Sequence, residues 1–435
     1  MTAPDIVNFG CRLNIAEGEA MRHAASAAGL GQATIINSCA VTHAAERDAT
    51  RAIRRAARDH PGRPIYVTGC AAETVRDQIA AMPDVTAIIA NSDKQSPAAW
   101  ARPGAAPGVP LMERREPFVP VVSGAAHARA FVAIQTGCDH RCTFCIIPFG
   151  RGNSRSAPMA RIIAAIQTVV ARGQHEVVLT GVDLTSYGHD LPATPTLGQL
   201  VARILVAVPN LARLRLSSLD SIEIDPLLFE LLTGEARMMP HVHLSLQAGD
   251  DMILKRMKRR HSRADAVRLV ARLKAARPAI AIGADLIAGF PTEDDAMAAN
   301  SLALIDDCAI AFGHIFPFSP RPGTPAARMP QVAVARARDR AAALRAAAQR
   351  QHGLLRAAMV GTRQNLLVEN DGCSGHAENF ARLTLVRRIT PQVLNSRLRA
   401  NDAGQGDVEV RPGAVVAVRV MDDTGAADAL EREPA

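Results

Sequence analysis

The stretch Gly137-Cys138-Asp139-His140-Arg141-Cys142-Thr143-Phe144-Cys145 places three thiols within eight residues, in the pattern C-x3-C-x2-C. Thiolates this close in sequence can converge on one soft metal centre, and iron–sulfur clusters are held by cysteine runs of this kind. A 4Fe-4S cluster has one more iron than this run has ligands, so one iron is left open unless a distant cysteine binds it. The amine and carboxylate of S-adenosylmethionine (SAM) suit that iron, and the stretch therefore predicts a SAM-cleaving cluster.

Two other interpretations of this run compete with a cluster. Buried free cysteines seldom gather at such a spacing. A zinc site usually shows paired C-x2-C units or histidines at ligand spacing, and the stretch has neither arrangement. The spacing, together with the aromatic Phe144 before Cys145, resembles the signature of the radical-SAM superfamily.

Length and composition exclude several classes of protein. The 435 residues suffice for two or three domains, and 48% hydrophobic with 21% charged residues is ordinary for a globular chain. No apolar run reaches the roughly 18 residues needed to span a bilayer, and no signal-peptide pattern is present. Eight cysteines in such a chain predict a cytoplasmic location and metal ligation rather than disulfides. The net charge of +8 suits a polyanionic partner without proving one.

Three β-branched runs near the N-terminus each lead to a cysteine. They are residues 5–10 before Cys11, 33–38 before Cys39 and 64–69 before Cys70. Helical patterns at 17–28 and 44–59 and a further strand at 85–90 complete a βαβα alternation, which predicts a doubly wound α/β domain. Because ligands gather at the carboxyl ends of parallel strands, the three cysteines are expected to be neighbours. They either hold a second cluster or are inert core thiols.

Strands and helices alternate again after a Pro-, Ala- and Gly-rich segment at 96–127 that reads as a linker. The predicted strands are 130–135, 176–181, 214–218, 241–246, 279–287 and 313–318. They predict a parallel barrel or part of one, in which polar residues at strand C-termini carry the chemistry. Each such residue alone is more often a helix cap or turn residue. The candidates are Asp183, Ser217, Gln247, Asp285 and Ser319.

Three features lie outside the predicted central strands. Residues 255–263 carry six Lys or Arg and predict a basic helix that faces either solvent or phosphate. Residues 332–359 predict a long Ala/Arg helix that braces the barrel. Alternating strands at 365–369, 381–386 and 414–420 predict a small β-barrel, a type that often binds nucleic acid. Cys308 and Cys373 are isolated, and the residues after Asp422 are expected to fray.

The chain resembles the radical-SAM methylthiotransferases along nearly its whole length. The resemblance rests on residues 10–14, 37–42, 68–70, 137–145, 179–188, 245–250, 283–293 and 316–325, and on 375–381, which resembles a TRAM domain. The modules it implies are an N-terminal domain at 1–95, the linker at 96–127, a radical-SAM domain at 128–358, a TRAM-like RNA-binding domain at 359–422 and a tail at 423–435.

The resemblance also implies cofactors and their ligands. An auxiliary 4Fe-4S cluster is expected on Cys11, Cys39 and Cys70, and the SAM-cleaving 4Fe-4S cluster on Cys138, Cys142 and Cys145. Residues Gly181 to Asp183 are expected to contact the SAM amino group, with Phe144 and Gln247 near the cofactor. Ser217 and Asp285 join this cofactor-binding set from the strand-end pattern.

The implied activity is sulfur insertion followed by methylation. An adenosyl radical removes hydrogen from a C–H bond, sulfur held by the auxiliary cluster is inserted, and a second SAM supplies the methyl group. Residues 37–42 and 145–156 are most similar to the MtaB-like branch, which acts on threonylcarbamoyladenosine beside the tRNA anticodon. Other branches act on isopentenyladenosine in tRNA or on a ribosomal-protein aspartate. An electron donor such as flavodoxin or ferredoxin is implied, and the sulfur donor is not identified. The alternative from another class is a non-catalytic iron–sulfur protein that binds RNA and senses redox state.

Overall fold

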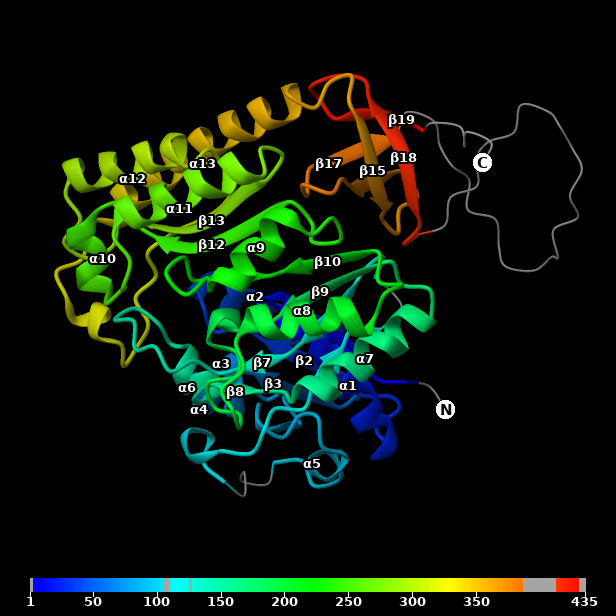
Figure 1. Cartoon of the computed structure of the whole chain (residues 1–435). Coiled ribbons are helices and arrows are strands. Elements are labelled where there is room, and N and C mark those ends of the chain that lie inside the picture. Colours follow the sequence, from blue (N-terminus) through cyan, green and yellow to red (C-terminus); the bar gives the residue numbers. More distant parts are fainter. Residues whose placement is uncertain (1–2, 105–108, 125–126, 386–411, 430–435) are drawn as a thin grey trace, which may run out of the picture.

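The computed structural model describes residues 3–104, 109–124, 127–385 and 412–429 (Figure 1). The N-terminal part of the chain forms a four-stranded parallel sheet. Its elements are β1 (Asp5–Asn8), α1 (Arg12–Ala27), β2 (Thr34–Ser38), α2 (His43–Asp59), β3 (Ile65–Gly69), α3 (Cys70–Thr74), α4 (Arg76–Ala80) and β4 (Ala87–Ile88). The strands pair in chain order, β1-β2-β3-β4. The predicted α/β class is confirmed. The strand order does not reverse within this described sheet, a detail that the doubly wound prediction did not capture.

The first part of the predicted linker packs against the N-terminal sheet. Helix α5 (Pro97–Ala101) carries Trp100, which is fully buried, and its Nε1 donates to the Lys94 carbonyl at 2.8 Å. The Trp100 ring meets Tyr66 edge-on, with 6.1 Å between the ring centroids. This segment is therefore a structured part of the N-terminal core. A short 3-10 helix η1 (Leu111–Glu113) follows it.

The central strands form two connected sheets with helices on their outer face. The elements are β5 (Val121–Val122), β6 (Ala130–Ala133), β7 (Gln135–Thr136), α6 (Ile147–Arg151), β8 (Arg155–Ser156), α7 (Met159–Ala171), β9 (Glu176–Thr180), η2 (Leu184–Ser186), α8 (Leu197–Ala207), β10 (Arg213–Leu216), β11 (Ser218–Leu219), α9 (Pro226–Gly234), β12 (His241–Gln247), α10 (Asp251–Met257), α11 (Arg263–Ala276), β13 (Ala281–Ala288), α12 (Asp295–Asp307), β14 (Ile310–Pro317) and η3 (Pro325–Arg328). The sheet orders are β10-β9-β6-β5 and β11-β12-β13-β14, with only β5 antiparallel to its neighbour. Ser217 alone separates β10 from β11. The predicted partial barrel and its six strands are confirmed.

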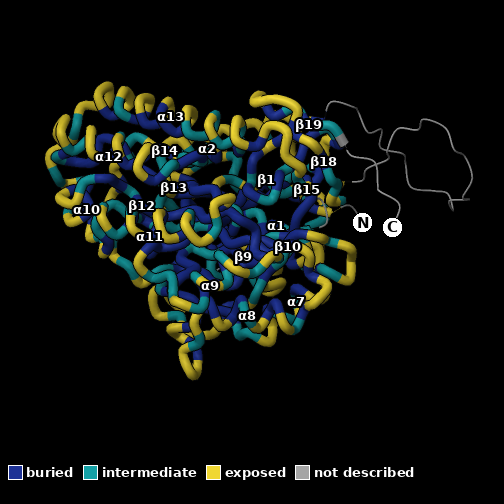
Figure 2. The backbone as a smooth tube through the Cα atoms, turned by 45° about the horizontal axis from the view of Figure 1, so that its top comes forward, coloured by how far each residue is buried: buried dark blue, intermediate teal, exposed yellow. Residues whose placement is uncertain are grey.

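Buried aliphatic side chains explain why these segments form strands and helices. Strand β9 is buried along its whole length, as an inner strand of a parallel sheet must be. On α7 the buried residues are Ile162, Ile166 and Val169, a helical spacing that turns one stripe toward the sheet. Figure 2 shows this layering, with buried strands inside and helices exposed on their outer faces. No helix within the described ranges is long and apolar enough to cross a membrane.

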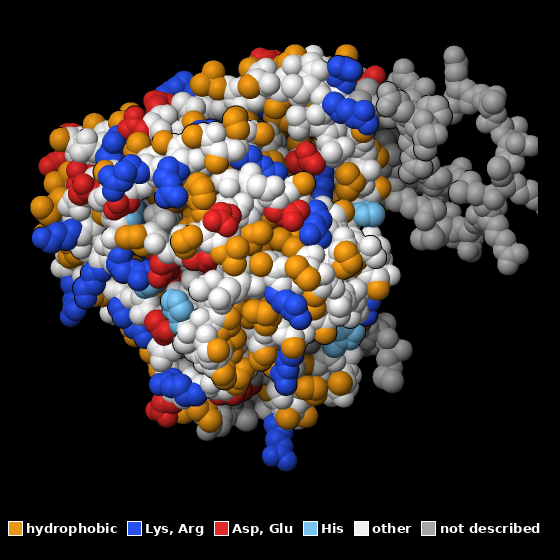
Figure 3. Space-filling view, in the orientation of Figure 1, with side chains coloured by type: hydrophobic (Ala, Val, Ile, Leu, Met, Phe, Trp, Pro, Cys, Tyr) orange, Lys and Arg blue, Asp and Glu red, His pale blue; other side chains and the backbone are white. Residues whose placement is uncertain are grey.

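The basic stretch at 255–263 is not one helix, so that prediction is wrong. Helix α10 ends at Met257, because the next residue, Lys258, adopts the left-handed conformation with φ of 59°. The next helix, α11, begins at Arg263, whose side chain pairs with Asp307. On the face seen in Figure 3, Lys and Arg side chains lie interspersed with Asp and Glu rather than in one continuous patch. The run therefore offers no continuous basic helix face.

The predicted long helix and C-terminal barrel are both present. Helix α13 (Val334–Ala357) packs along β14 and leads to the barrel (Figure 1). The barrel is closed, in the order β15-β16-β17-β19-β18, from β15 (Arg363–Val368), β16 (Ser374–His376), β17 (Arg382–Leu385), β18 (Val415–Val420) and β19 (Ala426–Ala429). The tail prediction is wrong for Ala426–Ala429, because β19 pairs with β17 and β18. Residue 386, the last of one predicted strand, lies outside the described residues.

One buried carboxylate joins the central sheet to the C-terminal barrel. Glu176 on β9 is fully buried, and the guanidiniums of Arg129, Arg213 and Arg215 surround it at 3.7, 3.5 and 3.1 Å. The same arginines reach the barrel. Arg129 pairs with Glu369, Arg213 donates to the Asn365 carbonyl at 2.5 Å, and Arg215 to the Glu378 carbonyl at 3.1 Å. Burial alone would raise the pKa of Glu176, but Arg215 and Arg129 lower it to about 2.

We expect Glu176→Gln to lower the free energy of unfolding by about 3–5 kcal/mol, because the change leaves buried guanidiniums without their shared counter-charge. The check is urea unfolding followed by circular dichroism. The matched control is Glu235→Gln, which breaks a partly exposed pair with Arg237 and is expected to cost at most about 1 kcal/mol. Equal losses for the two variants would contradict the role given to Glu176.

The lowered pKa of Glu176 also predicts a pH dependence of stability. Its folded-state pKa lies below the ordinary value of 4.5, so its contribution is present at neutral pH and is lost as the pH falls from about 4.5 toward 2. Over that range the wild type is expected to lose stability more steeply than Glu176→Gln. Parallel curves of unfolding midpoint against pH would contradict this expectation.

Candidate functional site

The loop with the three clustered cysteines follows β7, at the carboxyl end of the first barrel strands. Gly137 opens the loop with φ of 73°, and a Cβ there would lie 1.9 Å from the Asn153 carbonyl oxygen, so only glycine fits. The Cys138 amide donates to the Gly152 carbonyl at 3.1 Å. The loop is therefore fastened to the segment between α6 and β8.

Gln135 is an organising residue that the sequence did not indicate. Its buried side chain donates from Nε2 to the Gly137 carbonyl at 2.8 Å and to Ser154 Oγ at 2.9 Å. Its Oε1 accepts from the amides of Val182 and Asp183 at 2.9 and 3.0 Å. One amide group thus ties the cysteine loop to the predicted SAM-binding stretch. A single Gln within a strand gives no signal of such a role.

Asp183 lies directly beside the cysteine loop. Its Oδ2 lies 3.8 Å from Cys138 Sγ and 3.0 Å from His140 Nε2, and it accepts from Ser186 Oγ at 2.7 Å. Hydrogen bonding to Asp183, and then to Glu223, raises the pKa of His140 to about 10. Burial raises the pKa of Cys138, and Asp183 adds to this effect. Within the cysteine loop, His140 is thus held by the Asp183 carboxylate beside it.

Arg259 is a second residue that sequence reasoning did not single out. Its Nη1 lies 3.9 Å from Cys142 Sγ, and its Nη2 donates to Asp220 at 2.9 Å and to the Ser245 carbonyl at 2.8 Å. The guanidinium is a permanent positive charge beside a thiol that is expected to bind metal as thiolate. The only sequence signal for Arg259 was its place in the basic stretch at 255–263, and that stretch was predicted to face solvent or phosphate rather than a cysteine.

The three scattered cysteines gather at the carboxyl edge of the N-terminal sheet, as predicted. Cys11 caps α1, Cys39 follows β2 and Cys70 begins α3. A Cβ on Gly10 would lie 2.7 Å from Cys39 Sγ, so glycine allows the loop of Cys11 to approach Cys39. Burial, followed by the nearby Cys70, raises the pKa of Cys39 to about 12. Cys308 lies elsewhere, at the end of α12, and Cys373 precedes β16.

The two groups of cysteines lie against each other. A Cβ on Gly150 would lie 3.0 Å from the Cβ of Cys70, and Asn91 Nδ2 donates to the Gly150 carbonyl at 2.6 Å while lying 3.9 Å from Cys70 Sγ. Burial, together with nearby Cys142 and Cys70, raises the pKa of Cys145 to about 12. Metal groups held by the two sets would therefore face a common space.

A buried ion triad fixes this arrangement. Glu17 of α1 accepts from Arg151 Nη1 at 2.8 Å and from Lys94 Nζ at 2.6 Å. Arg151 lies in α6, directly after the cysteine loop, and also donates to Asn14 Oδ1. Burial alone would raise the pKa of Glu17, but Arg151 and Lys94 lower it to about 2. The triad joins the helix after Cys11 to the helix after Cys145.

The spacing of the thiols fits clusters better than single ions. In the described residues, two sets of three His, Cys, Asp or Glu ligand atoms lie within 4.8 Å of one another, and neither set contains a cysteine. Thiolates around one tetrahedral zinc, at about 2.3 Å from the metal, would lie only about 3.8 Å apart. Three thiols at a wider spacing suit three iron corners of a 4Fe-4S cube, each thiolate binding one iron.

The remaining predicted residues occupy different places. Phe144 packs edge-on against Phe290, with 6.4 Å between centroids, and Gln247 ends β12 with φ of 70°. Ser217 is buried, and its Oγ has no hydrogen-bond partner in the described structure. Ser319 Oγ accepts from the His43 amide at 3.2 Å. Asp285 lies within β13 rather than at its end, where its Oδ1 is 3.1 Å from His243 Nε2 and 3.4 Å from His314 Nδ1.

Comparison with known proteins gives two family matches and several relatives. The Radical SAM superfamily matches residues 132–305, and the Uncharacterized protein family UPF0004 matches residues 5–90. The threonylcarbamoyladenosine tRNA methylthiotransferase MtaB of Rickettsia prowazekii is 46% identical over 86% of this chain and 90% of its own length. The Bacillus subtilis protein of the same name is 32% identical over 74% of each chain. The tRNA-2-methylthio-N(6)-dimethylallyladenosine synthase of Novosphingobium aromaticivorans is 31% identical over 84% of this chain and 86% of its own length.

A solved structure gives the same fold. The radical S-adenosylmethionine methyltransferase TsrM of Kitasatospora setae, with cobalamin and a 4Fe-4S cluster bound, matches with a TM-score of 0.53 and 14% identity. The match covers 75% of this chain and 74% of TsrM. At this identity the likeness concerns the fold alone.

We expect Cys142→Ser and Cys39→Ser each to bind about half as much iron as the wild type after anaerobic reconstitution, because each removes a ligand of one cube. The double variant is expected to bind almost none. Iron and sulfide assays with electron paramagnetic resonance measure this. Cys308→Ser is the control and should bind wild-type amounts. Full iron content in Cys39→Ser would rule out the N-terminal cysteines as ligands.

Proposed function

The chain belongs to the radical-SAM tRNA methylthiotransferases of the MtaB type, and from this premise we propose how its residues share the reaction. The enzyme is a transferase that converts N6-threonylcarbamoyladenosine next to the tRNA anticodon to its 2-methylthio derivative, using SAM and two 4Fe-4S clusters. The single observation that carries the assignment of residues is the close approach of two cysteine triads across Gly150 and Cys70.

The two triads have separate tasks. Cys138, Cys142 and Cys145 would hold the SAM-cleaving cluster, and Cys11, Cys39 and Cys70 would hold the auxiliary cluster. When bound, these groups supply the radical that opens a C–H bond and the sulfur that is inserted there. The protein positions both, because Arg151 and Glu17 fix the two cysteine loops against each other. No general base is required for removal of a hydrogen atom.

The cofactor contacts are assigned by their place around the cysteine loop. Gly181 and Asp183 receive the SAM amino group, because Gln135 holds their loop beside Cys138. Ser217 follows β10 and Gln247 ends β12, both at carboxyl ends of strands, whereas Phe144 lies in the cysteine loop itself, and we assign all three to the cofactor side. Asp285 is directed to His243 and His314 instead, so we assign it to the substrate side of the barrel.

The module boundaries and partners follow from the same assignment. We propose an auxiliary-cluster module that extends beyond 1–95 to include α5, a linker from there to residue 127, a radical-SAM module at 128–358 and an RNA-binding module from 359 through β19. The tRNA anticodon loop is the macromolecular substrate, and a flavodoxin or ferredoxin supplies electrons. The site of action is the cytoplasm, where tRNA is modified.

The alternatives are not favoured. The chain is 46% identical to an MtaB enzyme but 31% identical to an enzyme named for dimethylallyladenosine. A non-catalytic redox sensor would not need two adjacent cysteine triads, of which one alone could respond to oxidants.

We expect tRNA from a deletion strain to lack the methylthio form of threonylcarbamoyladenosine and to accumulate the unmethylthiolated nucleoside. Nucleoside mass spectrometry measures both. A plasmid with the wild-type gene should restore the product, whereas Cys142→Ser should not. Purified enzyme with SAM and reductant should release 5′-deoxyadenosine. An unchanged tRNA profile would contradict the substrate, and the absence of 5′-deoxyadenosine would contradict the enzyme assignment.

A further inference from the structure

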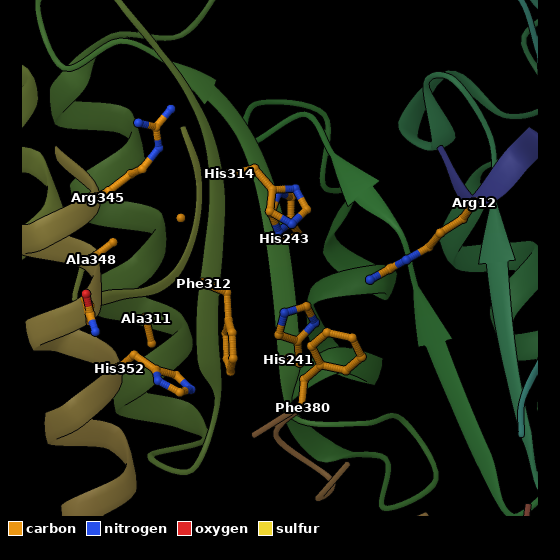
Figure 4. A pocket seen from close by; sticks show the side chains of 12 residues that line it. Arg12, His241, His243, Ala311, Phe312, His314, Arg345, Ala348, His352 and Phe380 are labelled. Carbon is orange, nitrogen blue, oxygen red and sulfur yellow. The ribbon is translucent and has the colours of Figure 1, made fainter. Parts of the chain in front are cut away.

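A cavity of about 360 Å³ lies where three parts of the chain meet, and the proposed reaction has not yet used it (Figure 4). It is bounded by the start of α1, by β12 and β14 of the partial barrel, by α13, and by the C-terminal barrel. The polar and aromatic side chains that define it include Arg12, His241, His314, Arg345, His352 and Phe380. None of the described residues that line it is Asp or Glu.

Arg12 enters this cavity with its hydrogen-bond donors free. Figure 4 shows its side chain extending toward His241 and Phe380. Its guanidinium lies 5.4 Å from the Phe380 ring centroid. It has no hydrogen bond or ion pair within the part of the chain that the structure describes. By contrast, Arg345 is already engaged, because its Nη2 donates to the Ile315 carbonyl at 2.8 Å. Arg12 is therefore the free cation of the cavity among the described residues.

The surroundings of Arg12 favour an anion. The guanidinium of Arg12 lies near those of Arg215 and Arg129, and its electrostatic neighbours also include the carboxylates of Glu176 and Asp285. The carboxylate of Asp285 is already in contact with His243 and His314. A largely buried guanidinium without a partner is unfavourable, and its planar set of donors matches a carboxylate with two parallel hydrogen bonds.

Phe380 holds the free guanidinium in place. The residue adopts φ of 72°, a backbone conformation that is strained for a bulky side chain, so the surrounding contacts must hold it. Its ring stacks on that of His376, with 4.6 Å between the ring centroids, and its centroid lies 4.9 Å from that of the His241 ring. The C-terminal barrel thus supplies the aromatic wall against which the Arg12 guanidinium lies.

The position of Arg12 in the chain connects the cavity to the chemistry. Arg12 directly follows Cys11, a proposed ligand of the sulfur-carrying cluster, so their Cα atoms lie about 3.8 Å apart. In adenine, the carbon that receives sulfur is separated from the carbon bearing the N6 substituent by one ring nitrogen. A base that presents the first carbon to the cluster therefore keeps the start of its N6 substituent close to that cluster, and Arg12, next to Cys11, is among the residues near it. The threonylcarbamoyl substituent ends in a carboxylate, whereas a dimethylallyl substituent has no charge.

We propose that Arg12 is the specificity-determining residue of this enzyme, and that its guanidinium pairs with the carboxylate of the threonylcarbamoyl group in the cavity closed by Phe380. This inference rests on the proposed function. Arg12 acts in substrate recognition and takes no part in hydrogen removal or sulfur insertion. The cavity provides for this a free guanidinium, an aromatic wall and a lining without Asp or Glu, and the nearby carboxylates of Glu176 and Asp285 already pair with other residues.

The first test uses the wild-type holoenzyme and no substitution. Anticodon stem-loops carry threonylcarbamoyladenosine, the same nucleoside with its carboxylate converted to an amide, dimethylallyladenosine, or unmodified adenosine. Fluorescence anisotropy at fixed salt gives each Kd independently of turnover. The amide is expected to bind about 10- to 100-fold more weakly than the acid, which is the range for a lost hydrogen bond to a charged group. Equal Kd values for acid and amide would overturn the proposal.

The second test assigns the effect to Arg12. Arg12→Gln should weaken binding of the acid to the level of the amide and leave the other stem-loops unchanged. Arg12→Lys should recover part of the loss, because lysine keeps the charge but not the paired donors. Arg350→Gln, an exposed arginine of α13, is the matched control and should bind as the wild type does. Iron content and electron paramagnetic resonance of each variant report on the neighbouring cluster.

The outcomes separate this inference from the proposed function. If Arg12→Gln weakens binding of all four stem-loops equally, Arg12 contacts an RNA phosphate and the proposal is wrong. If the wild type methylthiolates acid and amide with the same kcat/KM, the proposal is wrong while the proposed function stands. If the wild type methylthiolates none of the stem-loops, the proposed function itself fails.

Discussion

The carboxylate of Glu17 is the interaction on which the arrangement of the two cysteine triads depends. It is buried between Arg151 and Lys94, and each of these cations belongs to a different segment. Separating any one of the three would leave a charge in the interior without a counter-charge, which is far more costly than the pairs are stabilising. The ion triad therefore fixes the relative position of the segments that supply its three side chains. It leaves the helix after Cys11 and the helix after Cys145 one way to pack.

The same principle recurs where the C-terminal barrel meets the central sheet, and here too the cations outnumber the carboxylates. Glu176 is one carboxylate among three guanidiniums, and Glu369 compensates a second positive charge. Phe380 contributes its ring face to Arg129 and Arg215, at 5.6 and 4.9 Å from the ring centroid. The junction thus keeps a positive excess near the cavity. Such an excess suits an enzyme whose substrate is an anionic nucleic acid.

Sequence reasoning succeeded where the signal was local. The spacing of Cys138, Cys142 and Cys145 and the repeated strand–cysteine pattern predicted both groups of thiols, the parallel sheets and the closed C-terminal barrel. The sequence-based predictions failed where a single backbone dihedral angle, or pairing with a strand distant in sequence, decided the secondary structure. Lys258 ends a helix that composition would have continued, and β19 gives the expected tail a place in the barrel.

Functional residues without a local pattern could not be found from the sequence. Gln135 organises the cysteine loop through partners up to 48 residues away, and Arg259 reaches Cys142 across 117 residues. Asp285 illustrates the converse error. A strand-end rule placed it with Asp183, but the register of β13 puts it in the middle of the strand, beside two histidines. Which residues pair across the fold is set by tertiary packing, and a single sequence does not contain that information in readable form.

The first two turns of α1 link the position of the proposed cluster ligand Cys11 to the position of the proposed specificity residue Arg12. At 3.6 residues per turn, Asn14 and Glu17 lie on one face of the helix, and both contact Arg151. Leu13 and Ala16 turn a second face into the core. Arg12 lies roughly 200° around the helix from Asn14, so its side chain is directed away from the triad and toward the cavity. Because Cys11 immediately precedes this helix, the contact that fixes Glu17 also fixes a cluster ligand and the guanidinium beside it.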